Sequence, residues 1–407
     1  MTGVSGDMYD IASTFTNLVH LVFRKDPEKF EIYPLKTELW KKIKVKEGFQ
    51  GSGEELMRVD SLAGGYAFSG ANSSLAYANE SSLINPRITT KRFYAVSKVD
   101  TKSMAEAMND KGAFEGLLKR VRRDMERKIQ NGMSLCLFHS NISNELVLGT
   151  IASGGVSGSA GSGWTLTLDT FKKELFHKKQ ILHIEDGNTD PFEVTAVTDS
   201  SITVSRLSGS QVPAATDEIF LEGGDGNAFT GLKAITASSG TLYNVSIGGQ
   251  WEATIKDKSG RPLNTDMLFN LCVDVENHCG KKPDLLICSK EQFQKLGEYI
   301  EARYLPCDAK KKDTVGHDKF MLQIPGLQLE VIWDRHCDAD RVYLLNSECM
   351  EFYKSPMSGL VKDNGSLLMP DYINGTDSYL MVYRLYGEFF IEPCYVGLLD
   401  NLDTTVE

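Results

Sequence analysis

The longest run of helically spaced apolar residues lies between Asp100 and His139 and predicts one long helix. Ser103 and Glu106 have the spacing of a reciprocal N-terminal cap, and a glycine-containing break follows at 109–112. Beyond the break, apolar residues recur every three or four positions: Phe114, Leu117, Leu118, Val121, Met125, Ile129 and Cys136. Charged residues occupy most of the remaining surface. The pattern predicts an amphipathic spine helix with core positions Phe114, Leu118, Val121 and Met125.

Other stretches predict strands. Residues 88–96 combine β-branched and aromatic side chains with charges, which is typical of an exposed or edge strand. Short apolar runs separated by turn residues then indicate a small β-barrel-like insertion with strands at 165–168, 180–184, 192–197, 201–205 and 218–221. The Gly/Ser run at 154–163 that precedes them has the composition of a flexible linker.

The second half of the chain mixes helical and strand patterns. Residues 264–279 predict a helix, and an apolar strand at 284–288 is followed by a helix led by Ser289. Two apolar stretches, 327–333 and 342–346, are expected to pair with each other as strands, and a long strand is expected at 378–394. This mixture predicts an α+β protein.

Composition limits the classes of function. The chain has 407 residues, of which 41% are hydrophobic and 24% charged, as expected for a globular protein of two or three domains. The formal net charge of -11 argues against a general nucleic-acid-coating role. Apolar runs stay well short of the roughly 18–20 residues of a membrane span, and the N-terminus lacks a signal-peptide pattern. We therefore expect a cytoplasmic protein with no membrane partner.

The cysteines and one acidic cluster give no candidate cofactor site. Several of the eight cysteines lie inside apolar runs, where a thiol behaves as a small hydrophobe, so we expect no disulfide framework. Asp186, Asn188 and Asp190 match the first positions of a calcium loop, but Pro191 stands where that loop needs glycine. A β-turn is the better interpretation. The sequence predicts no metal, no cofactor and no catalytic residue.

A second polar cluster supports the main alternative function. Asp334, His336, Asp338 and Asp340 alternate, so a continuous strand would place all four on one face, as in a metal site. Their position between two apolar strands favours a turn instead. A soluble metal-dependent hydrolase using Asp334, His336 and Asp338 is the alternative hypothesis. A monomeric carbohydrate- or protein-binding module built on 164–221 is a third.

The order of the elements carries a resemblance to a known family. An extended arm, a protruding hairpin, a spine helix, an inserted β module, an α+β domain and a long C-terminal strand follow one another. The best local matches are 229–235 with Trp251 after it, and 327–333 leading to 342–346. In this order the chain resembles the major capsid proteins of tailed bacteriophages, whose Hong Kong phage-type fold is shared with the herpesvirus capsid floor.

The resemblance implies a division of the chain and a structural function. The implied parts are an N-terminal arm (1–50), an extended loop hairpin (51–98), a spine helix and peripheral domain (99–150, completed by 351–407), an inserted β domain (164–222) and an axial domain (227–350). Many copies would form hexamers and pentamers of an icosahedral or prolate shell around double-stranded viral DNA. A scaffolding protein, a portal and a decoration protein are the implied partners. The shell would belong to the virion and assemble in the host bacterial cytoplasm.

The implied working residues are contacts between subunits. A hairpin and an arm that cannot bury their own apolar residues must pack on neighbours. The expected contacts of the arm and the loop are Trp40, Leu56, Met57, Arg58, Tyr66, Phe68, Tyr77, Leu83 and Arg92. Some family members cross-link subunits through a lysine of the extended loop, but residues 47–90 contain no lysine. The expected lattice is therefore non-covalent.

Overall fold

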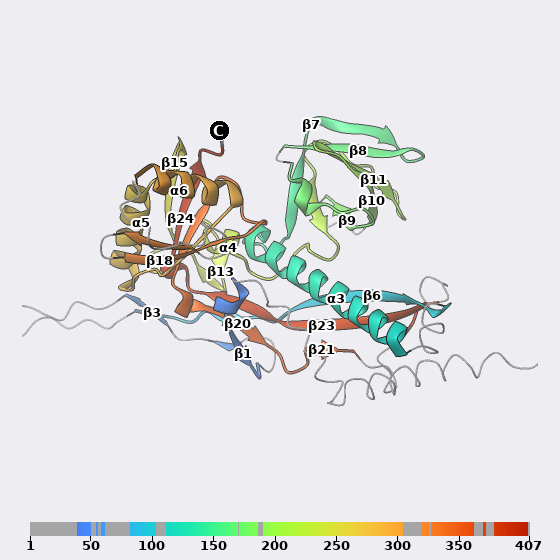
Figure 1. The fold of residues 1–407 in the computed structure, drawn as a ribbon, viewed down its shortest axis with the longest axis horizontal. Helices are drawn as coiled ribbons and strands as arrows, with labels where there is room; N and C mark the ends of the chain where they lie inside the picture. Colours follow the sequence, from blue (N-terminus) through green and yellow to red (C-terminus); the bar gives the residue numbers. More distant parts are fainter. Residues whose placement is uncertain are drawn as a thin grey trace, which may run out of the picture.

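A computed structural model gives the fold of the chain (Figure 1). It describes residues 39–49, 54–55, 58–61, 82–102, 111–169, 171–185, 190–303, 320–324, 327–361, 369–371 and 378–405. The predicted cap at Ser103 and Glu106 and the calcium-loop residues Asp186 and Asn188 lie outside these residues. So do five predicted contacts: Leu56, Met57, Tyr66, Phe68 and Tyr77. The side chains of three further predicted residues also lie outside the described set: Arg58, Phe114 and Leu118.

The predicted spine helix is α3 (Lys111–His139). Val121 and Met125, two of its predicted core positions, are buried, and the same face stays buried as far as Phe138. α3 packs against strand β6 (Lys91–Asp100). The spacing of apolar residues thus located both the helix and its inward face. No helix in the described part of the chain is long and apolar enough to cross a membrane.

A six-stranded sheet carries α3. Its two longest strands, β6 and β23 (Ser378–Ile391), pair antiparallel along the whole of β6, and we call this pair the ribbon. The remaining strands are β1 (Lys44–Glu47), β20 (Met350–Lys354), β21 (Gly359–Leu360) and β22 (Met369–Pro370). The strands predicted at 88–96 and 378–394 are therefore confirmed, and they are partners of each other.

Two short strand pairs precede the ribbon in the region predicted as the extended loop. β2 (Glu54–Glu55) pairs antiparallel with β5 (Arg87–Ile88), and β3 (Arg58–Ser61) pairs antiparallel with β4 (Ser82–Ile84). The inner pair is nested inside the outer pair along the chain, which is the connectivity of a hairpin. The backbone of this region therefore runs out and back, as the sequence predicted.

The predicted insertion is a closed six-stranded barrel, drawn in green in Figure 1. Its strands are β7 (Val147–Ser159), β8 (Gly163–Leu168), β9 (Ile181–Ile184), β10 (Phe192–Val197), β11 (Ser201–Arg206) and β12 (Glu218–Leu221). Five of them match predicted strands. Alternate side chains fill the interior, among them Trp164, Leu166, Phe192, Val194, Ile202 and Val204.

The Gly/Ser run at 154–163 is not a linker, so that prediction was wrong. Most of it belongs to β7, which pairs with β8 in a hairpin that closes at Ser159 and Gly163. At Gly158 the φ angle is +114°, and a Cβ would lie 2.1 Å from the Gly163 carbonyl oxygen. Only glycine tolerates this approach. The glycines serve a tight hairpin rather than flexibility.

A second six-stranded sheet combines five strands from the region predicted as the axial domain (227–350) with one strand, at 396–402, from the segment predicted to complete the peripheral domain (Figure 1). In spatial order it contains β15 (Thr254–Arg261), β24 (Val396–Leu402), β19 (Val342–Leu345), β16 (Leu285–Cys288), β18 (Leu327–Trp333) and β17 (Phe320–Ile324). The predicted helices are α5 (Thr265–Cys279) and α6 (Lys290–Arg303). Asn264 caps α5, its side-chain oxygen accepting the Met267 N–H at 2.8 Å.

The expected pairing of 327–333 with 342–346 was wrong. β16 lies between β18 and β19, parallel to the former and antiparallel to the latter. α6 provides the crossover that a parallel β16–β18 neighbourhood requires. Short elements complete the described fold: α4 (Leu232–Ile235), β13 (Thr241–Leu242), β14 (Val245–Ser246), and 3-10 turns at Trp40–Lys42, Lys173–Leu175, Ser347–Cys349 and Pro393–Tyr395.

Candidate subunit-contact surface

The ribbon has one covered and one uncovered face. Along β6, Ala95, Ser97 and Val99 are buried, whereas Tyr94 and Val96 between them are exposed by 49% and 41%. The buried set faces α3, because the Ser97 hydroxyl donates to the Asp124 carboxylate of that helix. Side chains alternate across a strand, so the exposed set lies on the opposite face. That face presents apolar side chains without cover from the described chain.

Aromatic and cationic side chains gather on this uncovered face. The Tyr94 and Tyr386 hydroxyls are 2.9 Å apart, and their rings meet edge to face at 6.1 Å between centroids. The hydrogen bond to Tyr386 raises the pKa of Tyr94 above its ordinary value. The guanidinium groups of Arg92 and Arg384 each lie 5.7 Å from the centre of the Tyr386 ring. Exposed Tyr and Arg are the residue types that contribute most to protein–protein interfaces.

Two predicted contact residues are exposed in the described structure. Arg92 lies on the uncovered face, and Leu83 of β4 is 52% exposed. The alternation of Lys91 to Asp100 could have identified Tyr94 as well, but the sequence prediction did not include it. Tyr386 contributes to the same face from a position 292 residues from Tyr94. This distance along the chain hides the cluster from any local pattern.

Trp40 lies in the subunit's own core rather than on its surface. Its side chain is buried, its ring centroid lies 5.2 Å from that of Phe389, and its Nε1–H donates to the Ser134 hydroxyl at 3.4 Å. This placement differs from the predicted subunit contact. The reason is that β1 follows directly and pairs with β20, which holds the segment against the subunit's own sheet.

A buried carboxyl joins β23 to the segment that carried the family resemblance. Glu388 accepts hydrogen bonds from the backbone N–H groups of Thr230 at 2.7 Å and of Phe389 at 3.0 Å. Burial raises the pKa of Glu388 to about 8, although these donors and Lys91 act in the other direction. The hydrogen bonds fix the segment at 229–235 against the ribbon. This is a structural role, because the carboxyl is enclosed by its own chain.

The Asp334–Asp340 segment forms turns between β18 and β19, as the sequence favoured. Asp334 accepts the His336 N–H at 2.9 Å, which is a local turn contact. The Asp338 carboxylate pairs with Lys172 and with Arg341. Burial acts to raise the pKa of Asp338, but these cations hold it below its ordinary value. Across the described residues, no three His, Cys, Asp or Glu side chains converge as metal ligands would, so the geometry gives the hydrolase alternative no support.

Two buried histidines lie beside this turn. Burial lowers the pKa of His139, the last residue of α3, to about 4 and that of His336 to about 3. Both are therefore neutral at physiological pH. Arg335 donates to the His336 ring at 3.0 Å, and Lys172 reaches Asp338 from the barrel. The site joins the spine helix, the barrel and the axial sheet, which explains why its polar groups are buried.

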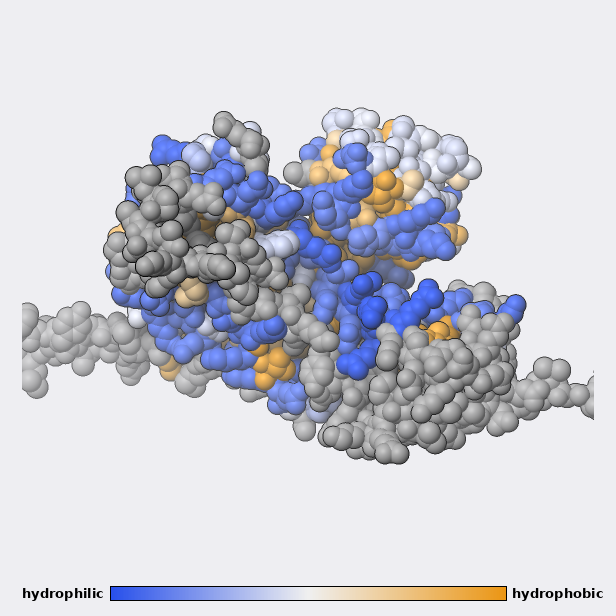
Figure 2. All heavy atoms as spheres, viewed as in Figure 1, coloured by the Kyte–Doolittle hydropathy of each residue, from blue (hydrophilic) through white to orange (hydrophobic). Residues whose placement is uncertain are grey.

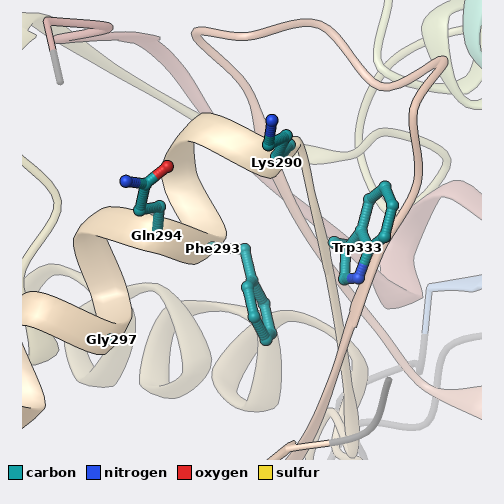
Figure 3. A pocket seen from close by; sticks show the side chains of 5 residues that line it. All are labelled: Lys290, Phe293, Gln294, Gly297 and Trp333. Carbon is teal, nitrogen blue, oxygen red and sulfur yellow. The ribbon is translucent and has the colours of Figure 1, made fainter. Parts of the chain in front are cut away.

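One shallow pocket lies between α6 and β18. Its volume is about 350 Å³, and it is lined by Lys290, Phe293, Gln294, Gly297 and Trp333. Figure 3 shows the Phe293 and Trp333 side chains pointing into the same space, with Lys290 and Gln294 at its margin. The walls are apolar, and no acid–base pair or nucleophile accompanies them. The pocket therefore has the character of a packing surface rather than of a reaction site.

Comparisons with known proteins place the fold. No family model and no curated protein matches the sequence. Among solved structures, the capsid asymmetric unit of cyanophage A-1(L) is similar with a TM-score of 0.53 and 7% identity, over 92% of this chain and 93% of that one. Gordonia phage Cozz follows with a TM-score of 0.46 and 11% identity, over 91% and 86% of the two chains. The capsid of a native GTA particle gives 0.46 and 8% identity, over 89% of each.

The first of these similarities covers nearly the whole of both chains. It therefore includes the ribbon, the spine helix and the axial sheet together rather than one common motif. At 7% identity it establishes the fold and no more than the fold. The chain has the capsid fold of tailed bacteriophages, as the order of its predicted elements implied.

Proposed function

We propose that this chain is a structural major capsid protein, without enzymatic activity, that self-assembles in many copies into a closed shell. The observation that carries the proposal is the uncovered ribbon face within a capsid fold. A monomeric protein rarely leaves Tyr, Val and two Arg side chains exposed together on one face of a sheet. In a shell, a neighbouring copy covers this face.

The extended loop is the element of a neighbour best suited to this contact. Its described strands form only two-stranded pairs, which cannot bury both of their faces. Two predicted contacts are exposed: Leu83 lies on the loop, and Arg92 lies on the ribbon face that a neighbour's loop would cover. Obligate interfaces of this kind bury more than about 2,000 Å². Each contact is individually weak and reversible, so errors of assembly can be corrected.

The shell that we propose is icosahedral or prolate, consists of hexamers and pentamers, and encloses double-stranded viral DNA. It forms in the host bacterial cytoplasm and becomes part of the virion. A separate scaffolding protein, a portal and a decoration protein are its proposed partners. The absence of lysine from residues 47–90 supports a lattice held by non-covalent contacts.

A deletion tests the proposal directly. Removal of residues 56–83 takes away most of the loop and leaves the ribbon, the spine helix and both large sheets. We expect a soluble, folded subunit that forms no shells, as seen by electron microscopy and analytical ultracentrifugation. The unmodified protein, expressed with and without its neighbouring gene products, is the control. Normal particles from the deletion variant would contradict the assignment of the loop.

A further inference from the structure

The outward side of α3 carries a row of arginines. Arg120, Arg123 and Arg127 are exposed, and their spacing of three and four residues places them on one side of the helix. They span about 10 Å along the helix axis, at 1.5 Å per residue. This side is roughly opposite to the one that carries Val121 and Met125. The three guanidinium groups therefore point away from the ribbon.

The acidic residues of the described part of this helix are engaged elsewhere. Glu126 pairs with Arg122 at 3.0 Å, and Asp124 pairs with Lys128 at 2.8 Å. Within the described chain, Arg120, Arg123 and Arg127 have no ion-pair partner. From residue 111 to 139 there are seven Lys or Arg against three Asp or Glu, in a chain whose formal net charge is -11. The arginine row is a local positive surface on an acidic protein.

The position of α3 shows which side of the subunit this surface occupies. In Figure 1, viewed along the shortest axis, α3 lies in front of β6 and β23. In the same view in Figure 2, the part of α3 that is not drawn in grey presents mostly hydrophilic residues. The row therefore lies on a broad face of the subunit, opposite the uncovered ribbon face. In a shell of such subunits, a broad face becomes either the inner or the outer surface.

We propose that the outward side of α3 lines the inside of the shell and that Arg120, Arg123 and Arg127 contact the phosphates of the enclosed double-stranded DNA. This inference rests on the proposed function. Guanidinium groups match phosphate oxygens in geometry and charge. B-DNA rises about 3.4 Å along its axis for each phosphate of one strand, so a row about 10 Å long covers the axial rise of about three nucleotides. The rest of the acidic surface repels DNA, so contact is confined to this row and stays weak enough for release.

The first test measures DNA binding by the unassembled, full-length subunit. The variant R120Q/R123Q/R127Q is compared with K178Q/R261Q/K290Q, which loses the same charge from exposed positions on other elements. The probe is a fluorescent random-sequence duplex of about 30 base pairs, followed by anisotropy from 50 to 200 mM salt. We expect the arginine variant to bind at least tenfold more weakly, with a salt dependence reduced by about three counterions. The control variant should stay within twofold of the unmodified protein.

The outcomes separate this inference from the proposed function. Equal loss in both variants, or no binding by the unmodified subunit at 50 mM salt, overturns the inference even if shells form. Failure of the unmodified protein to form shells overturns the proposed function instead. Polyglutamate that binds more tightly than the duplex, with the same arginine dependence, also overturns the inference by indicating an acidic protein partner. Unchanged melting temperature and shell formation in the arginine variant exclude misfolding as the cause.

The second test locates the row in the shell. Arg123→Cys is treated with a maleimide attached to a polymer too large to cross the shell wall, and labelling is counted above that of the unmodified protein. We expect labelling of free subunits and protection in closed shells. If free subunits and closed shells are labelled equally, α3 lies on the outside of the shell and the proposal is overturned.

Discussion

The barrel and the ribbon bury a β-sheet in opposite ways. The barrel closes on itself, so its sheet has no free edge and its inward side chains, such as Leu166 and Val204, are fully enclosed. The ribbon is covered by α3 on one face, while Tyr94 and Val96 are exposed on the other. Within the described residues, one element is covered on all sides and the other is not. The proposed contact between subunits uses the element that is left uncovered.

The largest expected effect comes from cavities in the two cores. Met125→Ala beneath the ribbon and Ile202→Ala inside the barrel each remove a fully buried side chain, at a cost of about 2–5 kcal/mol. We expect M125A to unfold the ribbon and abolish shells, whereas I202A loosens the barrel and leaves shells intact. Hydrogen exchange resolved along the chain, with electron microscopy, measures both effects. Loss of shells in I202A would show that assembly depends on the barrel as well as on the ribbon.

The next effect comes from the exposed apolar residues of each region. We expect Y94S/V96S to weaken the contact between two subunits at least tenfold, or about 1.4 kcal/mol per contact, and so to reduce the yield of shells, while the melting temperature of the free subunit barely changes. Leu207 and Val212, between the last two barrel strands, are more exposed than Tyr94 and Val96, which makes L207S/V212S the control. That control should assemble normally. Equal impairment of both pairs would remove the distinction between the regions.

The smallest effect concerns the buried carboxyl of the ribbon. The pKa of Glu388 is about 8 in the folded protein against an ordinary value of 4.5, so the folded state retains a proton that the unfolded chain has lost between these pH values. Its contribution to stability is full below pH 4.5 and declines as the pH rises to 8. We expect Glu388→Gln, which keeps the acceptor oxygen, to raise the melting temperature by about 2–4 °C at pH 8 relative to its effect at pH 5. Calorimetry at both pH values measures this difference. A change in melting temperature that is the same at pH 5 and pH 8 would contradict a protonated Glu388 carboxyl in the folded protein.

Local patterns were sufficient for most of the elements. The helix face at Val121 and Met125 follows from the 3.6-residue period, and five barrel strands follow from alternation bounded by turns. β7 escaped prediction because its glycines carry no side chains to alternate. The sheet order around β16 escaped because β16 and β19 are buried on both faces, which leaves no period to indicate neighbours.

The candidate contact surface was less accessible from the sequence. Arg92 and Leu83 were predicted as contacts through the resemblance, and both are exposed. The interior position of Trp40 depends on Phe389, and the Tyr94–Tyr386 cluster depends on the pairing of two strands distant in sequence. Such pairings follow from the complete topology. No window of the sequence contains both partners.

The chain enters and leaves the barrel at adjacent positions. The Leu146 N–H donates to the Gly224 carbonyl oxygen at 2.7 Å, on either side of the barrel strands. A segment whose ends lie this close can be exchanged without stretching the chain on either side. The site is thus suited to protein engineering: an enzyme or antigen with adjacent termini would replace the barrel there without pulling apart the residues on either side.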